Sequence, residues 1–378
     1  MSRYVSFQTR AAAESWLASV GPAFGLPRAP VWVGRTRSDF VITQPATIYQ
    51  AGAEFRVDVD ADFVGKVSRS AVSSAAKQPI GGLVAEVDVR DFGADVTGVN
   101  DSTIAFINAF KAVKNGEVLR LPAGTFTVAP DSVGWPARRI VGMPNRTIIR
   151  PSSVGEWVVR CNGITHIQDV TIEAGGCSVG LYLDGSNESN ITRVIVTGAN
   201  VGVYAREAQR AVFEHCRTEL NDIGIKLVGC NATALRDHTS ARNRIGIEVV
   251  GVNSGTGETA ASGSLRAYNG DISSNSEWQV MLRGIEGGTY ADWYIEALGQ
   301  GVLVENSYGL SLERIRLTGG DYQLNNSNTI RMRCCDGGNH LTHGATKIRF
   351  SGPRPTTEEC RIITKVATSA TLLQEIED

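Results

Sequence analysis

A repeat of 22 residues runs through the middle of the chain and constrains its fold more than any other feature. Short apolar segments around a glycine recur as VGLYL, VGVYA, IGIKL and IGIEV, with the glycines at Gly180, Gly202, Gly224 and Gly246. Gly301, in QGVLV, follows Gly246 by 55 residues, which equals 22 plus 33. The intermediate repeat therefore places Gln279 at the glycine position, with 11 extra residues in the loop 253–263. A fixed period of this length is typical of a solenoid.

The residues that follow each glycine alternate in polarity, as in a β-strand with one buried face. The first position after the glycine is apolar and so is the third, whereas the second carries Tyr182, Tyr204, Lys226 and Glu248. An α-solenoid with this period would need two helices of about two turns each, and isolated helices that short are unstable. The repeat therefore predicts an all-β fold, a single-stranded parallel β-helix whose rungs have about 22 residues.

The repeat also assigns individual residues to the inside or the surface. Cys216 shares a column with Ile172 and Val194, so we expect it in the core. One column predicts an asparagine ladder at a corner of the rungs, with Asn187, Asn231 and Asn253. Three aromatic residues are expected in the core: Trp278, Tyr290 and Trp293. Three others are expected to face outward, where rings can stack on sugars: Tyr182, Tyr204 and Tyr294.

Composition excludes several classes of protein. The 378 residues carry a net charge of −2, so nucleic acid and anionic membranes are poor default partners. No stretch reaches the roughly 18 apolar residues of a membrane span, and the N-terminus lacks the apolar core of a signal peptide. The seven cysteines contain no CxxC pair and histidine is scarce, so we expect folding in a reducing cytosol and neither a metal nor another cofactor.

The chain falls into four expected parts. Residues 1–62 form a small mixed module, with a helix over 10–20 and strands over 40–50 and 53–60. An Ala/Ser-rich neck or linker covers 63–85. The β-helix itself covers 86–350. Closing strands follow over 351–378.

The segment DFGADVTGVNDSTIAF, at 91–106, contains three aspartates that suggest a metal loop: Asp91, Asp95 and Asp101. Their spacing differs from that of a calcium-binding loop. Asn100 or Asp101 is instead suited to cap the amphipathic helix expected over 102–113. A solenoid needs such a helix to cover its first rung, so we interpret this segment as scaffold.

VRDFGADVTGVNDSTIAFINAF, at 89–110, followed by LRLPAGTFTV, resembles the leading segment of pectate-lyase-superfamily right-handed β-helices. Phage tailspikes and related polysaccharide-degrading proteins are the best-known members of that family. One departure is that Asp95-Val96-Thr97-Gly98 stands where the family usually has Gly-Asp-Gly. The resemblance implies a right-handed β-helix, a homotrimer, and an N-terminal module that attaches to the virion.

Surface columns of the rungs hold the candidate chemistry. Arg193, His215, Asp237, Gly270 and Asp292 fall in one column. Glycoside hydrolysis needs two carboxyl groups, about 5 Å apart for retention or about 6.5–9.5 Å for inversion. With a rung spacing of about 4.8 Å, Asp237 and Asp292 are expected roughly 10 Å apart. Glu214 lies one rung from Asp237 but one position earlier, so strict alternation would send the two to opposite faces unless the chain bends.

The candidate catalytic residues are therefore Asp237, Asp292 and Glu214. The candidate substrate-binding residues are Arg193, His215, Arg217 and Tyr294. The alternative without chemistry is a solvated ladder of alternating charge, with Arg193 over His215 over Asp237. A lyase would need a compact acidic cluster for calcium, and neighbouring columns contain none.

These observations predict a phage tailspike, made in the host cytoplasm and located in the virion tail. Its N-terminal module would bind tail, baseplate or portal-adaptor proteins, and its β-helix would bind host surface polysaccharide. Cleavage of that polysaccharide by endoglycosidase activity stays open. The alternatives are a structural or receptor-binding spike without catalysis, and a polysaccharide lyase. We expect no nucleic-acid partner and no insertion into a membrane.

Overall fold

The computed structural model describes residues 86–114, 116–132, 134–135, 138–251, 262–333 and Cys335, and elsewhere it describes individual strands only. The chain divides into two compact units, Met1–Leu83 and Val84–Asp378. The expected linker 63–85 and the expected helix over 10–20 lie outside the described residues. Within the described residues, no helix is long and apolar enough to cross a membrane.

The first unit contains two small antiparallel sheets. One has the strand order β1 (Arg3–Phe7), β5 (Glu54–Val59), β4 (Ile48–Ala51). The other has the order β2 (Arg28–Val33), β3 (Thr36–Ile42), β6 (Ala61–Asp62). The strand predicted over 53–60 is β5, whereas the segment 40–50 contains the end of β3 and the start of β4.

The second unit begins with the segment that carries the family resemblance. It contains β7 (Glu86–Asp88), a 3-10 helix η3 (Val89–Phe92), β8 (Thr97–Asp101) and the helix α2 (Thr103–Ala112). The carboxylate of Asp95 accepts the backbone N–H groups of Asn100 and Thr97, at 2.7 Å and 2.9 Å. These hydrogen bonds lower the pKa of Asp95 and hold the loop closed, which supports a scaffold role.

The N-cap of α2 is Ser102, one residue after the expected Asn100 or Asp101. The Ser102 hydroxyl accepts the N–H of Asp95 at 2.9 Å and so joins the loop to the start of the helix. Asp101 contributes from outside the helix, because its carboxylate accepts the N–H of Thr103 at 2.7 Å. The buried face of α2 then packs Phe106 against Phe126, with ring centroids 5.6 Å apart, and covers the first rungs.

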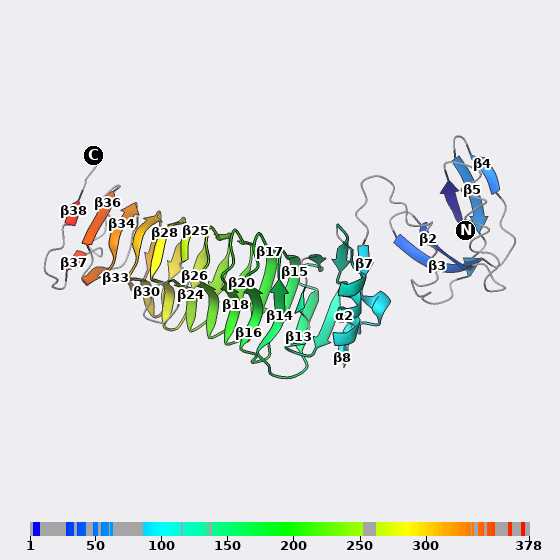
Figure 1. Cartoon of the computed structure of the whole chain (residues 1–378), viewed down its shortest axis with the longest axis horizontal. Helices are drawn as coiled ribbons and strands as arrows, with labels where there is room; N and C mark the ends of the chain where they lie inside the picture. The colour runs from blue at the N-terminus through cyan, green and yellow to red at the C-terminus, as the bar shows by residue number, and fades with distance from the viewer. Residues whose placement is uncertain are drawn as a thin grey trace. The chain divides into compact units, whose positions relative to one another are not determined.

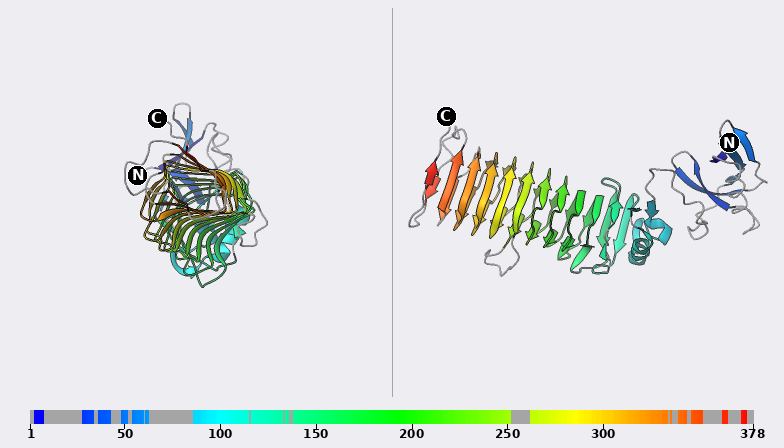
Figure 2. Two further views of the ribbon diagram at one scale, coloured as in Figure 1. Left: turned by 90° about the vertical axis from the view of Figure 1, so that its left-hand side faces the viewer. Right: turned by 45° about the horizontal axis from the view of Figure 1, so that its top comes forward.

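The remainder of this unit is a right-handed parallel β-helix, whose strands stack along one axis from α2 to β38 (Figure 1). Figure 2 shows this stack from its end and from another side. One of its sheets has 11 strands: β11 (Gly134–Trp135), β14 (Trp157–Asn162), β16 (Val179–Asp184), β18 (Val201–Arg206), β21 (Ile223–Val228), β24 (Ile245–Val250), β27 (Trp278–Arg283), β30 (Gln300–Glu305), β33 (Asp321–Asn325), β35 (Asn339–His343) and β37 (Ile362–Thr364).

The other sheet has 21 strands and bends along a corner that divides most rungs into two strands. Besides β7 and β8 it contains β9 (Val118–Arg120), β10 (Gly124–Val128), β12 (Arg139–Val141), β13 (Thr147–Pro151), β15 (His166–Glu173), β17 (Asn190–Thr197), β19 (Val212–Glu214), β20 (Arg217–Glu219), β22 (Ala234–Arg236), β23 (Thr239–Ala241), β25 (Ser262–Tyr268), β26 (Asp271–Ser273), β28 (Ile285–Ala291), β29 (Tyr294–Glu296), β31 (Tyr308–Glu313), β32 (Arg316–Thr318), β34 (Asn328–Arg333), β36 (Thr346–Ser351) and β38 (Leu372–Gln374).

The register in the 11-stranded sheet is the one that the repeat predicts. The residues after the repeat glycines pair across successive strands in one column: Leu181, Val203, Ile225, Ile247, Val280 and Val302. The glycines are required because the next rung lies too close for a side chain. A Cβ atom on Gly224 would lie 2.6 Å from the carbonyl oxygen of Gly246 and 2.3 Å from the Ser240 hydroxyl.

A buried asparagine ladder joins three successive rungs, but not in the predicted column. The side-chain oxygen of Asn243 accepts the backbone N–H of Asn221 at 3.0 Å, and that of Asn275 accepts the N–H of Asn243 at 2.9 Å. Asn275 donates in turn to the side-chain oxygen of Gln279 at 2.7 Å, so the residue that replaces the repeat glycine ends the ladder.

The predicted ladder column lacks a continuous run of asparagines. Gln209 lies between Asn187 and Asn231, and its backbone N–H donates to the Asn187 side chain at 3.0 Å. Gly263 follows Asn231 in the column, and Asn253 lies outside the described residues. Asn187 and Asn231 thus share a column as predicted, but the third member was wrong, because the extra residues before β25 bring Gly263 onto Asn231.

The interior is filled by aliphatic side chains with a few large aromatic ones. Cys216, Tyr290 and Trp293 are buried there, as predicted. Burial raises the pKa of the Cys216 thiol to about 12, which makes it an inert core residue. Trp278 is an exception: it is half-buried and packs in a separate cluster with Ile245 and Met281. It is the first residue of β27, where it pairs with Ile245 at the start of the strand and outside the main core, so the prediction of a core position was wrong.

Candidate functional site

One column of residues, which we call the corner column, has a left-handed backbone in successive rungs, and all of its residues except the buried Asp169 are exposed. In it φ lies between 47° and 60° at Asp169, Arg193, His215, Asp237, Asn269, Asp292 and Arg314. Such a conformation costs a residue other than glycine roughly 1–2 kcal/mol. Hydrogen bonds between rungs hold it, as where the His215 N–H donates to the Arg236 carbonyl at 3.0 Å. The corner column lies where the 21-stranded sheet bends, for example between β19 and β20.

The bend brings together three of the predicted site residues, which we call the corner cluster: Glu214, His215 and Asp237. One side-chain atom of each residue, a carboxylate oxygen or an imidazole nitrogen, lies within 4.8 Å of the corresponding atoms of the other two. The His215 Nδ1 atom lies 3.9 Å from an Asp237 carboxylate oxygen, and the Asn269 side chain donates to the other oxygen at 3.1 Å. Glu214 and His215 are neighbours in sequence, yet both reach this face because the left-handed residue interrupts the alternation of the strand.

The corner cluster could also share a cation, since histidine and carboxylates are common metal ligands. It is the one group of three or more such residues that converges within the part of the chain the structure describes. Its side chains are half-buried or exposed, and exposed acidic groups often converge in this way without an ion. The expectation that the protein uses no metal therefore stays a prediction.

On both sides of the corner cluster the corner column is occupied by ion pairs. Arg193 binds Asp169 with two hydrogen bonds, of 2.5 Å and 2.8 Å. Arg314 binds Asp292 in the same way, at 2.6 Å and 2.8 Å. The hydrogen bond from Arg314 lowers the pKa of Asp292, so this carboxyl stays ionised and is a poor proton donor. Asp292 is also separated from Asp237 by Asn269, as expected for two rungs.

The remaining predicted residues lie in the next outward column beyond the corner, which runs through Arg217, Thr239, Asp271 and Tyr294. Arg217 is exposed and forms an ion pair with the buried carboxylate of Glu219, which also pairs with Arg242. Tyr294 leaves 42% of its surface exposed, as predicted for an outward-facing ring. These two residues therefore flank the corner cluster on the same side of the β-helix.

The insertion changes the predicted register at this corner by one residue. Asn269, rather than Gly270, follows Asp237 in the corner column, and Tyr268 follows Arg236 in the column of Glu214. In the 11-stranded sheet the corresponding step is 33 residues, from Ile247 to Val280, whereas here it is 32. The two sheets therefore absorb the insertion differently, which periodicity measured on one of them does not show.

The other outward tyrosines form a ladder that leaves little ring surface for a ligand. Tyr182 and Tyr204 stack at 5.1 Å with their planes 7° apart, and both are half-buried. The guanidinium of Arg160 lies 5.5 Å from the centroid of Tyr182. Since neighbouring rungs cover the flat faces of these rings, we interpret them as structural rather than as a platform for sugars.

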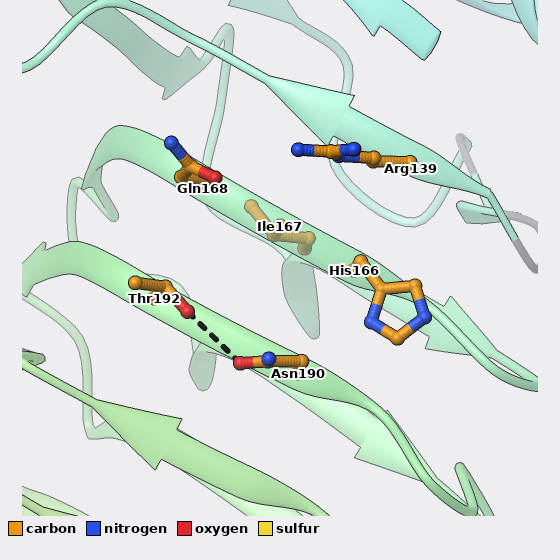
Figure 3. Close-up of a pocket in the computed structure, with 6 residues that line it drawn as sticks. All are labelled: Arg139, His166, Ile167, Gln168, Asn190 and Thr192. Atoms are coloured by element: carbon orange, nitrogen blue, oxygen red, sulfur yellow. Dashed lines mark hydrogen bonds between the residues drawn. The ribbon is translucent and has the colours of Figure 1, made fainter. Parts of the chain in front are cut away.

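A pocket of about 260 Å³ lies on the outer side of β12, β15 and β17. We call it the Arg139 pocket, and its lining is Arg139, His166, Ile167, Gln168, Asn190 and Thr192. Figure 3 shows its polar side chains on one side of three neighbouring strands. The strand pairing of Thr192 with Glu214 places it one rung from the corner cluster. None of its residues was predicted as a site from sequence, because four of them precede Gly180, where the clear repeat begins, and Asn190 and Thr192 carry no charge that would mark them.

No family model matches the chain, and no curated protein matches it. Solved structures do match. The family 28 exopolygalacturonase of Yersinia enterocolitica is 11% identical, with a TM-score of 0.52 over 75% of this chain and 79% of that one. The chain shares the parallel β-helix fold of this enzyme. An identity this low establishes the fold of this β-helix protein and leaves its function to be argued from its residues.

Two phage proteins are among the more distant structures similar to this β-helix protein. The tailspike protein gp49 of Pseudomonas phage LKA1 is 12% identical, with a TM-score of 0.43 over 77% of this chain and 81% of that one. ORF18 of Geobacillus virus E2 is 14% identical, with a TM-score of 0.46 over 77% of this chain. The chain spans 61% of the length of ORF18.

Proposed function

We propose that this β-helix protein is a phage tailspike that binds host surface polysaccharide along its corner column. The observation that carries the proposal is the convergence of Glu214, His215 and Asp237 on an exposed face, between rungs whose polar groups recur in register. A row of donors and acceptors repeated at rung spacing suits an extended polymer of hydroxyl-rich units. The resemblance of 89–128 to the leading segment of tailspike β-helices supports the choice of a phage protein.

Arg193, Arg217 and Tyr294 are the proposed substrate-binding residues around the corner cluster. Tyr294 offers an exposed ring on the same face as Arg217, three strands along one column. An aromatic ring can bind the apolar face of one sugar, and a cation three strands away, roughly 14 Å, can bind the hydroxyl groups of another unit of the same polymer. Because Arg193 and Arg217 are already paired with Asp169 and Glu219, they would act as ordered donors.

A second candidate function is cleavage, which the spacing of Glu214 and Asp237 favours. Their oxygen atoms come within 4.8 Å of each other, close to the separation of about 5–5.5 Å found in retaining glycosidases. In such a reaction one carboxylate attacks the anomeric carbon while the other acid protonates the departing oxygen. We propose Glu214 and Asp237 for these roles, with His215 orienting Asp237, and give Asp292 the role of an ion-pair partner of Arg314.

The attachment and the oligomeric state are also proposals. We propose that residues 1–62 attach the spike to tail, baseplate or portal-adaptor proteins, and that the protein is a homotrimer in the virion tail. Both rest on the family resemblance of the segment 89–128. A solution mass near three times 40.5 kDa, measured by light scattering, supports the trimer, and a monomeric mass contradicts it.

Binding and cleavage are tested with purified full-length protein and lipopolysaccharide or capsule extracted from a panel of bacteria. We expect one preparation to bind and to release new reducing ends. General acid–base groups contribute about 10²–10⁴-fold, so Glu214→Gln and Asp237→Asn should lower the release by at least about 100-fold and leave binding intact.

Asp292→Asn is the matched control. It removes one carboxylate from the same column, and the ion pair lost is worth only about 0–1 kcal/mol at the surface, so activity should stay near that of the wild type. Binding without any cleavage would contradict the glycosidase proposal and support a receptor-binding spike without catalysis. Full activity in both active-site variants would dismiss the Glu214–Asp237 pair. Absence of binding to every preparation would overturn the proposed function.

A further inference from the structure

The Arg139 pocket is built from three neighbouring strands and has an apolar base. Arg139 on β12 pairs with His166 on β15, which pairs with Asn190 on β17. Ile167 is buried beneath them with 1% of its surface exposed. The lining side chains are thus anchored in a regular sheet, which makes the pocket largely pre-formed.

Internal hydrogen bonds determine what the pocket offers to a ligand. The Thr192 hydroxyl donates to the side-chain oxygen of Asn190 at 2.9 Å, which leaves the amide N–H groups of Asn190 as donors (Figure 3). The Gln168 amide donates to Asp169 at 2.8 Å, which leaves its oxygen as an acceptor. Arg139 has no ion pair with any residue that the structure describes. Donors therefore outnumber acceptors, and the pocket suits a ligand rich in acceptor oxygens.

Two acids in the neighbourhood of the pocket, Asp169 and Glu86, are bound by other arginines and so do not neutralise Arg139. None of the lining residues is acidic. Asp169, beside Gln168, is bound by Arg193 at 2.5 Å and 2.8 Å. Glu86 lies in the column of Arg139, two strands away, and is bound by Arg120 through two hydrogen bonds of 2.7 Å. The local field therefore favours an anion, and a guanidinium binds a carboxylate through two parallel hydrogen bonds.

We propose that the Arg139 pocket binds the carboxylate of an acidic sugar, a uronic acid unit of the polysaccharide. This inference rests on the proposed function for its polymer and adds the chemical class of one unit. Arg139 would hold the carboxylate, while Asn190, His166 and Gln168 would bind ring hydroxyls. The column from Gln168 through Thr192 reaches Glu214 on the next rung, so this unit would lie beside the proposed cleavage site.

Full-length protein is titrated with glucuronate and with galacturonate, and methyl glucoside serves as the neutral probe. Binding is followed by ligand-observed NMR. We expect both uronates to bind at least about tenfold more tightly than methyl glucoside, because only they can pair with the guanidinium. Arg139→Gln should abolish this preference. Arg331→Gln removes the same charge further along the same column and should leave it unchanged.

Uronates that bind no better than methyl glucoside, or a preference that survives Arg139→Gln, would overturn the inference. The proposed function fails separately, in the binding of extracted polysaccharide. If polysaccharide binds while uronates do not, the tailspike proposal stands and the pocket assignment falls. If uronates bind through Arg139 while no polysaccharide binds, the pocket assignment stands without the tailspike proposal.

Discussion

At the scale of single residues, the corner column explains how neighbours in sequence come to share one face. Glu214 and His215 would point to opposite faces of a regular strand. His215 adopts φ 52° instead, so both side chains reach the surface beside Asp237. Outside glycine, asparagine, aspartate and histidine adopt such backbone angles several times more often than other residues, but Arg193 and Arg314 adopt them here as well. This residue preference alone is too weak to locate a bend, because it is the bonds between rungs that hold the conformation.

A second feature at this scale lies directly beneath the corner cluster. The imidazole of His238 is buried, and neither of its nitrogens has a hydrogen-bond partner among the described residues. It packs edge-on against Trp293, with centroids 6.0 Å apart. Burial lowers the pKa of His238 to about 4, because the charged form would lose its hydration. The core therefore holds this histidine in its neutral form.

We predict that His238 makes the fold sensitive to acid. Its pKa in the folded chain is below the ordinary value of 6.5, so the unfolded chain takes up the proton first as the pH falls. The stabilisation is complete above pH 6.5 and declines down to about pH 4, where the loss reaches about 3 kcal/mol. Urea unfolding at several pH values measures it. His238→Leu should flatten the dependence, and an equally steep dependence in that variant would contradict the assignment.

At the scale of elements, the asparagine ladder joins successive rungs where the chain turns into the 11-stranded sheet. Each buried backbone N–H at this corner needs an acceptor, since an unpaired buried donor costs about 1–3 kcal/mol. Asn221, Asn243 and Asn275 supply these acceptors in turn, and all are at most 5% exposed. The ladder thereby fixes the position at which each new strand begins.

Asn243→Ala should be among the more destabilising substitutions at the corners. It removes the acceptor of the Asn221 N–H and the donor that reaches the Thr218 carbonyl at 3.2 Å, for a loss of about 2–4 kcal/mol. Asn200→Ala is the matched control, because its side chain is exposed, its backbone is not left-handed, and it forms no side-chain hydrogen bond with the described residues. We expect a loss below about 1 kcal/mol there. Thermal unfolding compares them, and equal losses would refute the ladder's role.

At the scale of the whole molecule, the second unit is close to a one-dimensional stack in which each rung contacts its neighbours. Strand β21 pairs with β18 and β24, and this pattern continues along the sheet. The stability of such a fold is approximately a sum of rung and interface contributions. The register between rungs, rather than any particular rung, is therefore what the fold must preserve.

Removing one complete rung should consequently be tolerated better than removing half of one. Deletion of 223–244, which is 22 residues, brings Ile245 to the position of Ile223 and keeps every column aligned. Deletion of 223–233 is shorter but misaligns all later rungs. Far-UV circular dichroism and thermal unfolding should show a cooperative β-fold for the first variant and its loss for the second. Similar behaviour of the two would contradict a register-determined stack.

Much of the fold was predictable, because it depends on a short-range pattern. The spacing of Gly180, Gly202, Gly224 and Gly246 locates four strands and their register. Of the candidate site, the column of Arg193, His215, Asp237 and Asp292 was also predictable. Two aspects were not: the pairing of Asp292 with Arg314, and the convergence of Glu214 with Asp237. Both depend on side-chain directions at a bend, which periodicity does not encode.

By itself, the sequence determined the rung, its length, its buried face and the helix that covers its first turn. These follow from glycine spacing and alternating polarity, which are properties of consecutive residues. Only the tertiary structure decided the corners: which residue turns left-handed, how the extra residues between β24 and β25 shift the register to Asn269, and that Arg139 and Asn190 share a pocket. The physical reason is that corners are held by hydrogen bonds between rungs, which join residues far apart along the chain, such as His215 with Arg236 and Asn243 with Asn275.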